Sequence, residues 1–198
     1  MLPLSGPRPC DLAKVVTVLH KGAVVGLPTD TVYGLAADPM NQEAVALLFA
    51  LKGRPAVKPV PLLAASLEHA ARFGVIEGAA LYAAKTYWPG PLTIVVRRVT
   101  GLPDWVGDPE VDSVGLRVPD HPAALSVLAT SGPLAVTSAN RSGEAPAADD
   151  GAAQAMFGAR VAYYVPGSGA GAVPSTVVDF TGASPRVLRS GPVTWEEA

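Results

Sequence analysis

A short segment rich in hydroxyl groups, Pro28–Leu35 (PTDTVYGL), is the first place where the residue types suggest chemistry. Two threonines, an aspartate and a tyrosine stand there between a proline and a glycine. A loop that only turned the chain would not need so many short hydroxyl side chains together with a phenol. Hydroxyl groups that converge on one point can hold a small polar ligand in a mostly apolar pocket. The segment therefore predicts a ligand-binding loop.

A cluster of cations follows, with Lys52, Arg54 and Lys58 in seven residues and no acid between Glu43 and Glu68. The end of a helix explains part of it, because lysine complements the helix dipole and glycine caps the last turn. Arginine just after that glycine favours phosphate binding, because a guanidinium grips phosphate oxygens with a planar fork. Both interpretations stay open on this motif alone.

The segment Ser113–Val118 has the alternation of a strand with one packed face and one polar face. Side chains on a strand point to opposite faces in turn. One face carries the apolar residues Val114, Leu116 and Val118, and the other carries Ser113, Gly115 and Arg117. An arginine on an uncrowded polar face indicates that this strand borders a cleft.

Two further motifs have a structural and a functional interpretation. Ser138 and Asn140 follow an apolar run, where they form either an ordinary turn or a ligand contact at the end of a strand. The glycine-rich segment 167–172 formally matches a loose dinucleotide-binding pattern. That pattern must open a helix, whereas Pro174 and a β-branched run follow here. A flexible flap or connector is the better interpretation.

Composition and charge restrict the class of protein. The 198 residues are 49% hydrophobic and 16% charged, which is typical of a globular chain of one domain. The net charge of −2 does not indicate a nucleic-acid binder. A single cysteine, Cys10, excludes an internal disulfide and makes the cytoplasm the simplest setting. No signal peptide and no apolar stretch of membrane-spanning length are expected.

The periodicity predicts irregularly alternating helices and strands. Helices are expected at residues 12–19, 41–52, 66–73, 77–88, 123–130 and 149–158. Strands are expected at residues 23–27, 61–65, 92–96, 113–118, 134–137, 161–165, 175–180 and 186–189. Several strands follow one another without a helix between them. A mixed α+β fold, with flanking helices on a twisted mixed sheet and a single domain over residues 1–198, fits this order best.

Several stretches together resemble one family, the YrdC-like threonylcarbamoyl-adenylate synthases. They are PTDTVYGL, KGRP, WPGPLT, VGLRVPDHP, TSANRSG, STVVDF and LRSG, in the family's order and spacing from about residue 10 to residue 191. The pair KGR and SAN resembles the KxR…SxN signature of active synthases. The chain is similar to the short form of the family. The resemblance implies a YrdC-like fold whose sheet encloses a deep concave pocket.

The resemblance also implies an activity. ATP, L-threonine and bicarbonate or carbon dioxide would be the substrates, with Mg²⁺ on the phosphates and no tightly bound cofactor. The products would be threonylcarbamoyl-AMP and pyrophosphate, which makes the expected enzyme a nucleotidyltransferase. A downstream threonylcarbamoyl transferase complex would use the first product to modify transfer RNA. A weak direct contact with that RNA stays open, and a membrane partner is not expected.

Residue roles carry over by position. The resemblance implies threonine binding by Thr31, Arg117 and Ser175. It implies ATP binding by Arg54, Ser113, Ser138 and Arg189, with Lys52 and Asn140 completing the signature. Lys52 and Arg54 would have the catalytic role of neutralising triphosphate charge as pyrophosphate leaves. Lys58 could serve phosphate as a point charge. No side chain need act as a covalent nucleophile, because the substrate supplies one.

The chain departs from the family pattern at three places, and two alternatives remain. Lys58 stands where the family often has Asn, a His is missing near Leu63, and a Ser is missing near Pro146.

The cation cluster is also consistent with an RNA-binding module of the same fold without catalysis. A carbamoyl-handling relative is the other alternative, although hydrogenase-maturation carbamoyltransferases carry this domain in longer chains with zinc-finger cysteines.

Overall fold

A computed structural model describes residues 10–53, 59–171 and 173–195. The helices are α1 (Leu12–His20), α2 (Gln42–Lys52), α3 (Leu67–Ala70), α4 (Gly78–Tyr87), α5 (Pro122–Ser131) and α6 (Asp150–Phe157), with a 3₁₀ turn η1 (Gly158–Arg160). The strands are β1 (Val25–Leu27), β2 (Gly34–Ala37), β3 (Leu62–Leu63), β4 (Leu92–Arg97), β5 (Ser113–Arg117), β6 (Leu134–Ser138), β7 (Tyr163–Tyr164), β8 (Thr176–Asp179) and β9 (Arg186–Arg189).

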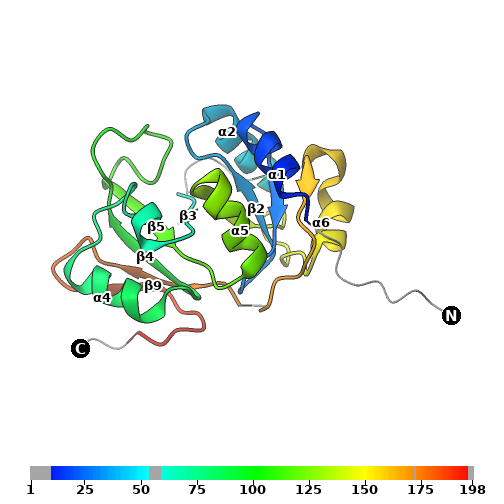
Figure 1. Cartoon of the computed structure of the whole chain (residues 1–198). Coiled ribbons are helices and arrows are strands. Elements are labelled where there is room, and N and C mark those ends of the chain that lie inside the picture. The colour runs from blue at the N-terminus through cyan, green and yellow to red at the C-terminus, as the bar shows by residue number, and fades with distance from the viewer. Residues whose placement is uncertain (1–9, 54–58, 172, 196–198) are drawn as a thin grey trace.

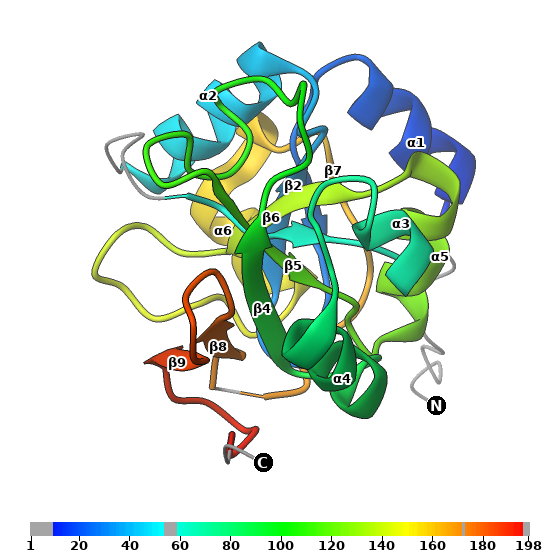
Figure 2. The same cartoon turned by 90° about the vertical axis from the view of Figure 1, so that its left-hand side faces the viewer.

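The strands form one mixed sheet in the order β7-β1-β2-β6-β3-β5-β4-β8-β9. The pairs β1 with β7, β3 with β5 and β4 with β8 are parallel, and the other neighbours are antiparallel. Helices flank the sheet in both views (Figures 1 and 2). The predicted mixed sheet with flanking helices is therefore confirmed.

Local sequence signals fix the ends of the helix that leads to the cation cluster. The side chain of Asn41 accepts a hydrogen bond from the backbone N–H of Ala44 at 3.0 Å and so caps the start of α2. Gly53 ends the helix in the left-handed region at φ 60°, which glycine adopts without steric cost. Both residues act as the sequence predicts.

The half of the sheet made by β1, β2 and β6 is covered on both faces over most of its length, but Gly34 of β2 and Thr137 and Ser138 of β6 border a cavity. Ala36 of β2 packs in a cluster with Val15 of α1 and Val127 of α5. Its neighbour Leu35 points to the opposite face, into a cluster that contains Leu48 of α2. Burial on both faces removes the alternation of polar and apolar residues that marks a half-exposed strand.

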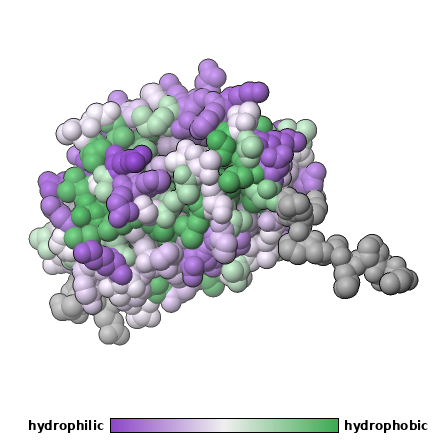
Figure 3. All heavy atoms as spheres, in the orientation of Figure 1, coloured by the Kyte–Doolittle hydropathy of each residue, from purple (hydrophilic) through white to green (hydrophobic). Residues whose placement is uncertain are grey.

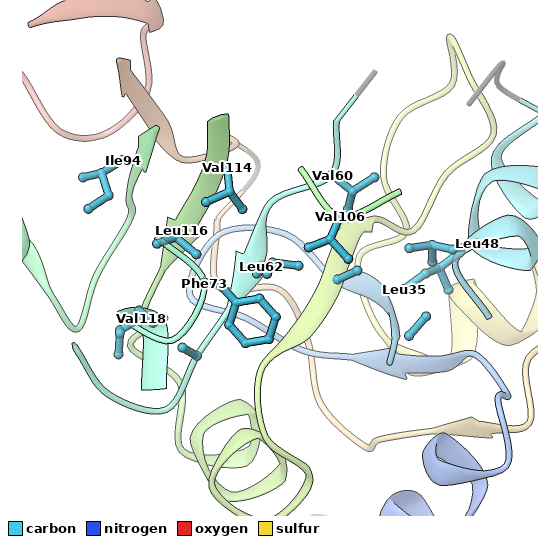
Figure 4. Packing of buried hydrophobic residues seen from close by; sticks show 14 of the residues in the cluster. Leu35, Leu48, Val60, Leu62, Phe73, Ile94, Val106, Val114, Leu116 and Val118 are labelled. Carbon is cyan, nitrogen blue, oxygen red and sulfur yellow. The ribbon is translucent and has the colours of Figure 1, made fainter. Parts of the chain in front are cut away.

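The half made by β5, β4, β8 and β9 is covered on one face only. Leu92, Ile94 and Val96 of β4 belong to the core cluster, together with alanines of α4. The core side chains run from Ile94 and Val114 past Leu62 to Leu35 and Leu48, across both halves of the sheet (Figure 4). The residues between them on β4 and β5 face the other way and line cavities, namely Thr93, Val95, Ser113, Gly115 and Arg117.

Two elements differ from the sequence prediction. Gly34 and Leu35 belong to β2, which pairs with β1 in a hairpin, so the loop predicted over Pro28–Leu35 ends earlier than expected. The run GLAA is short, small and buried on both faces, so it lacks a period-2 pattern. The strand predicted at 161–165 is limited to Tyr163–Tyr164 at the edge of the sheet.

The molecular surface mixes hydrophobic and hydrophilic residues on the face seen in Figure 3, as is usual for a globular chain. None of the helices in the described part of the chain has the length and apolar character needed to cross a bilayer.

Candidate functional site

Two adjoining cavities lie over the uncovered face of the sheet. The inner cavity, of about 230 Å³, is lined by Thr29, Thr31, Leu63, Thr137 and Ser138, among others. The outer cavity, of about 510 Å³, is lined by Val95, Val111, Ser113, Val177 and Leu188, among others. Both are also lined by Pro59, Pro61, Thr93 and Arg189. The two cavities therefore share one wall, and two ligands that react with each other can bind side by side in them.

Arg117 and Arg189 both line the inner cavity, and Arg117 is the more deeply buried of the two. Arg117 is only 4% exposed, and each of its guanidinium nitrogens donates a hydrogen bond to a protein oxygen. Nε donates to the Gly90 carbonyl at 3.0 Å, Nη1 to Thr31 Oγ1 at 2.9 Å, and Nη2 to Asp30 Oδ1. Burial lowers the pKa of Arg117 and the Asp30 carboxylate opposes that shift. Because the ordinary pKa of arginine is so high, the side chain stays a cation.

The loop before β2 is ordered by its own hydroxyl groups. Thr29 Oγ1 donates to the Val32 carbonyl at 2.7 Å and accepts from the Thr31 N–H at 3.2 Å. Tyr33 does not join the other hydroxyls, because its O–H donates to the buried Val165 carbonyl at 2.8 Å. Burial also raises the pKa of Tyr33. The predicted convergence of hydroxyl groups is correct for the threonines and wrong for the phenol.

The glycine-rich segment lies against this loop. The N–H of Ala170 donates to the Thr29 carbonyl at 3.0 Å, and the N–H of Gly171 to the Thr31 carbonyl at 2.7 Å. A Cβ on Gly169 would come within 2.5 Å of the backbone nitrogen of Tyr33, so only glycine fits there. Residues 167–171 therefore form a connector fastened to the threonine loop.

Ser175 lies between two other polar residues of the shared wall. Its Oγ is 2.8 Å from Thr93 Oγ1 and accepts from Arg189 Nη2 at 3.1 Å. Arg189 Nε donates to the Ser175 carbonyl at 3.0 Å. The parallel pairing of β4 with β8 brings these residues together although they are far apart in the sequence.

Lys52 and the turn after β6 form a buried polar cluster. The ammonium of Lys52 donates to the Ser138 carbonyl at 2.8 Å, to Ser138 Oγ at 3.2 Å and to Asn140 Oδ1. Asn140 donates from Nδ2 to the Arg141 and Glu144 carbonyls. Lys52 is 5% exposed, so α2 meets the wall of the inner cavity through Ser138.

Comparison with known proteins is decisive for the family. The Sua5/YciO/YrdC family model, described as "Telomere recombination", matches residues 17–191. The chain belongs to this family.

Relatives within the Sua5/YciO/YrdC family are similar over most of the chain. The putative threonylcarbamoyl-AMP synthase of Mycobacterium tuberculosis is 40% identical over 197 residues, covering 96% of this chain and 88% of the relative. The threonylcarbamoyl-AMP synthase of Halorhodospira halophila is 38% identical over 164 residues, covering 82% and 85% of the two chains.

Solved structures agree with the fold. Pyrococcus abyssi Sua5 complexed with L-threonine superposes with a TM-score of 0.84 at 32% identity, covering 93% of this chain and 56% of that one. Escherichia coli YciO gives the same TM-score at 23% identity and supports the fold alone. T. kodakarensis HypF gives a TM-score of 0.75 at 22% identity, covering 91% of this chain and 24% of that one, and it too supports the fold alone.

The residues that the family resemblance singles out fall into three groups. Thr31, Arg117, Ser138 and Ser175 line the inner cavity, Ser113 lines the outer cavity, and Arg189 lines both. Lys52 and Asn140 form the cluster behind Ser138. Arg54 and Lys58 lie outside the described residues. Leu63, where the family often has a histidine nearby, presents an apolar side chain to the inner cavity.

Sequence reasoning assigned no role to Thr93, Thr137, Asp30 or the Gly90 carbonyl. Thr93 and Gly90 both belong to the motif WPGPLT, which carried the family resemblance. The motif could have pointed to both residues. Their contacts, Thr93 with Ser175 and Gly90 with Arg117, depend on which strands are neighbours in the sheet. Asp30 lies in the threonine loop, where its partner could not be identified from spacing.

The site fits a metal that arrives with a nucleotide better than a metal held by the protein. The described residues contain no group of three or more His, Cys, Asp or Glu side chains placed to hold an ion. Mg²⁺ usually keeps several waters and binds through substrate phosphates with few carboxylates. That mode of binding needs no carboxylate cluster among the residues that the structure describes.

Proposed function

We propose that this protein is an L-threonylcarbamoyladenylate synthase, which makes threonylcarbamoyl-AMP and pyrophosphate from L-threonine, bicarbonate or carbon dioxide, and ATP. The observation that carries the proposal is the buried guanidinium of Arg117 in a small hydroxyl-lined cavity that shares a wall with a larger one. Family relatives named threonylcarbamoyl-AMP synthase support it, as does the threonine complex of Pyrococcus abyssi Sua5.

The inner cavity suits the amino acid. A carboxylate entering beside Arg117 meets a cation whose orientation is already fixed by Gly90, Thr31 and Asp30. Fixed donors bind a carboxylate without reorganisation, which favours a zwitterion of this size. The hydroxyls of Thr31 and Ser175 add donors and acceptors for the remaining polar groups.

The outer cavity suits the nucleotide. Val95, Val177 and Leu188 give it apolar walls against which a base can pack. Arg189, at the boundary with the inner cavity, can neutralise phosphate charge, and Ser113 can donate a hydroxyl hydrogen bond. Arg54 and Lys58 lie outside the described residues, and their role as cations for the nucleotide rests on the family resemblance alone. Mg²⁺ bound with ATP would supply further charge neutralisation on the phosphates.

The chemistry then needs two bond-forming steps. The threonine amine attacks carbon dioxide, or bicarbonate with loss of water; an N–C bond forms and a proton leaves. A carbamate oxygen next attacks the α-phosphorus, the bond to the β-phosphate oxygen breaks, and pyrophosphate departs. The substrate supplies the nucleophile in both steps, so the protein contributes positioning and electrostatic stabilisation. Arg117 holds the carboxylate while Arg189 faces the phosphates.

The product is a mixed anhydride of a carbamic acid and a phosphate, so an acceptor must take the carbamoyl group before water does. A threonylcarbamoyl transferase complex that modifies transfer RNA in the cytoplasm is the expected consumer. An RNA-binding function without catalysis is less well supported, because Lys52 of the cation cluster is buried against Ser138 and Asn140.

The test is pyrophosphate release from ATP. The purified protein should release pyrophosphate only when threonine and bicarbonate are both present, and Arg117→Ala should abolish measurable threonine binding in calorimetry. Arg97→Ala is the matched control. Arg97 is an exposed arginine on β4 whose guanidinium lies 3.9 Å from the Glu77 carboxylate, so this variant should behave as wild type. Folded protein that releases no pyrophosphate under these conditions would contradict the proposal.

A further inference from the structure

A pair of buried hydroxyl groups joins the two cavities. Thr93 Oγ1 lies 2.8 Å from Ser175 Oγ, and the two residues are 3% and 5% exposed. Thr93 lines both cavities, and Ser175 lines the inner one. Among the described residues, Ser175 is the hydrogen-bond partner found for the Thr93 hydroxyl. A buried hydroxyl hydrogen without an acceptor is costly, and donation to Ser175 would satisfy the hydrogen of Thr93 within the protein.

Arg189 fixes the direction of one of the two hydrogen bonds made by the Ser175 hydroxyl. A guanidinium can only donate, and its Nη2 donates to Ser175 Oγ at 3.1 Å. In the contact between Thr93 and Ser175 either hydroxyl can be the donor, and with Thr93 as the donor it fills the second lone pair of the same oxygen. A serine hydroxyl has two lone pairs and one hydrogen. With both lone pairs occupied, the hydrogen of Ser175 is left to donate into the inner cavity.

We propose that Thr93 is a positioning residue for the amino-acid substrate, acting through the hydroxyl of Ser175. This inference rests on the proposed function, because it takes the carboxylate of threonine as the acceptor in the inner cavity. Two donors to one hydroxyl polarise it, and a polarised hydroxyl in a cavity of low dielectric is a stronger donor to an anion. Thr93 thus fixes both the direction and the strength of the Ser175 hydrogen bond.

Two substitutions separate this role from packing. Thr93→Val keeps the shape of the side chain and removes its hydroxyl, whereas Thr93→Ser keeps the hydroxyl. We expect Thr93→Val to weaken threonine binding about fivefold, in line with the loss of one polarised hydrogen bond. ATP affinity should stay at the wild-type value. Thr93→Ser should restore threonine affinity to within about twofold of wild type, since the same hydrogen bond can form.

Thr176→Val is the matched control. Thr176 is equally buried and follows Ser175 directly, but its hydroxyl donates to the Val193 carbonyl at 2.7 Å and accepts from the Val193 N–H at 3.0 Å. We expect this variant to lower the melting temperature and to keep the wild-type affinity for threonine. Calorimetry with threonine and ATP separately, the KM for threonine, kcat and thermal melts are measured on all four proteins.

The outcomes distinguish the inference from the proposed function. Wild-type affinity for threonine in Thr93→Val, a Thr93→Ser variant as weak as Thr93→Val, or a parallel loss of ATP affinity would each overturn the role of Thr93. A wild-type protein that binds threonine but releases no pyrophosphate would overturn the proposed function, while the binding comparison among the variants would still be readable. A rise in KM for threonine at unchanged kcat in Thr93→Val, reversed in Thr93→Ser, supports the inference.

Discussion

The two halves of the sheet differ in how many of their faces are covered. Strands β1 and β2 are buried at every residue, between α1 and α5 on one face and α2 on the other. Strands β4 and β5 pack against the core on one face and line the cavities with the other, and β9 is exposed throughout. The uncovered face is where ligands can take the place that a helix layer occupies in the first half.

This difference has a consequence for polar groups. In the half that carries the cavities, buried polar side chains are held by one another, as Arg117 is by Asp30 and Ser175 is by Thr93. Such pairs are favourable only while both members are present. The uncovered half should therefore be the more sensitive to single polar substitutions, and the following predictions test that expectation from the largest effect to the smallest.

Asp30→Ala should have the largest effect on stability. It leaves the guanidinium of Arg117 buried without its counter-ion, and breaking a buried pair in this way costs about 3 kcal/mol of unfolding free energy. The ion pair of Arg186 with Asp179 offers a matched comparison, because the Arg186 side chain is 74% exposed. Arg186→Ala should cost under about 1 kcal/mol. Urea unfolding measures both, and equal losses would remove the contrast between buried and exposed pairs.

Lys52→Met should destabilise the polar cluster through which α2 contacts Ser138 and Asn140. The substitution removes the donors to Ser138 and Asn140 and should lower the unfolding free energy by about 2 kcal/mol. Pyrophosphate release should fall with it, because Ser138 loses a contact that orients it at the cavity wall. Lys85→Met, on the exposed side of α4, is the control and should leave both quantities unchanged. A stable Lys52→Met protein would show that the cluster does not support the fold.

Gly169→Ala should disturb the threonine loop. The added Cβ would meet backbone atoms of Val32 and Tyr33 at 2.5–2.8 Å, so the loop must shift, and overpacking of this kind costs about 1–3 kcal/mol. We expect weaker threonine binding in calorimetry. At Gly171 the nearest atom is the Thr31 carbonyl oxygen at 3.4 Å, so Gly171→Ala should behave nearly as wild type. If both variants bound threonine equally well, the connector would have no part in the site.

The smallest effect concerns pH and His121, which lies before α5. Burial lowers the pKa of His121, and the charges of Asp30 and Asp120 oppose the shift. The unfolded chain then takes up the proton first, near its ordinary pKa of about 6.5. This contribution to stability is present above that pH and is lost as the pH falls through the folded pKa. The urea midpoint should drop between pH 7 and pH 5.5, and less so in His121→Gln. The exposed His20→Gln should keep the wild-type slope.

Part of the architecture could be predicted because its causes are local. The caps of α2 at Asn41 and Gly53 follow from the residues that satisfy or end a helix. The alternation of Ser113–Arg117 is confirmed, because a strand with one open face must alternate. The mixed sheet could be expected from the order of helices and strands. These features depend on neighbours within a few residues.

The remainder depends on contacts that no local pattern contains. Arg117 meets Asp30 across 87 positions, and Thr93 meets Ser175 across 82. Both contacts follow from the order of strands in the sheet. The strand β2 was missed because small residues buried on both faces have no alternation. Tyr33 was expected to face the ligand because the spacing of a loop does not say which of its side chains turns inward.

Ser175 lies just before β8 and Arg189 ends β9, so both residues are synthesised late. During translation, the segments that carry Thr31 and Arg117 leave the ribosome well before those that carry Ser175 and Arg189. A polypeptide released by premature termination before Ser175 would keep the strands of the covered half but would lack Ser175, the partner of Thr93, and Arg189, the partner of Ser175. Incomplete products of synthesis would therefore lack part of the wall that the two cavities share.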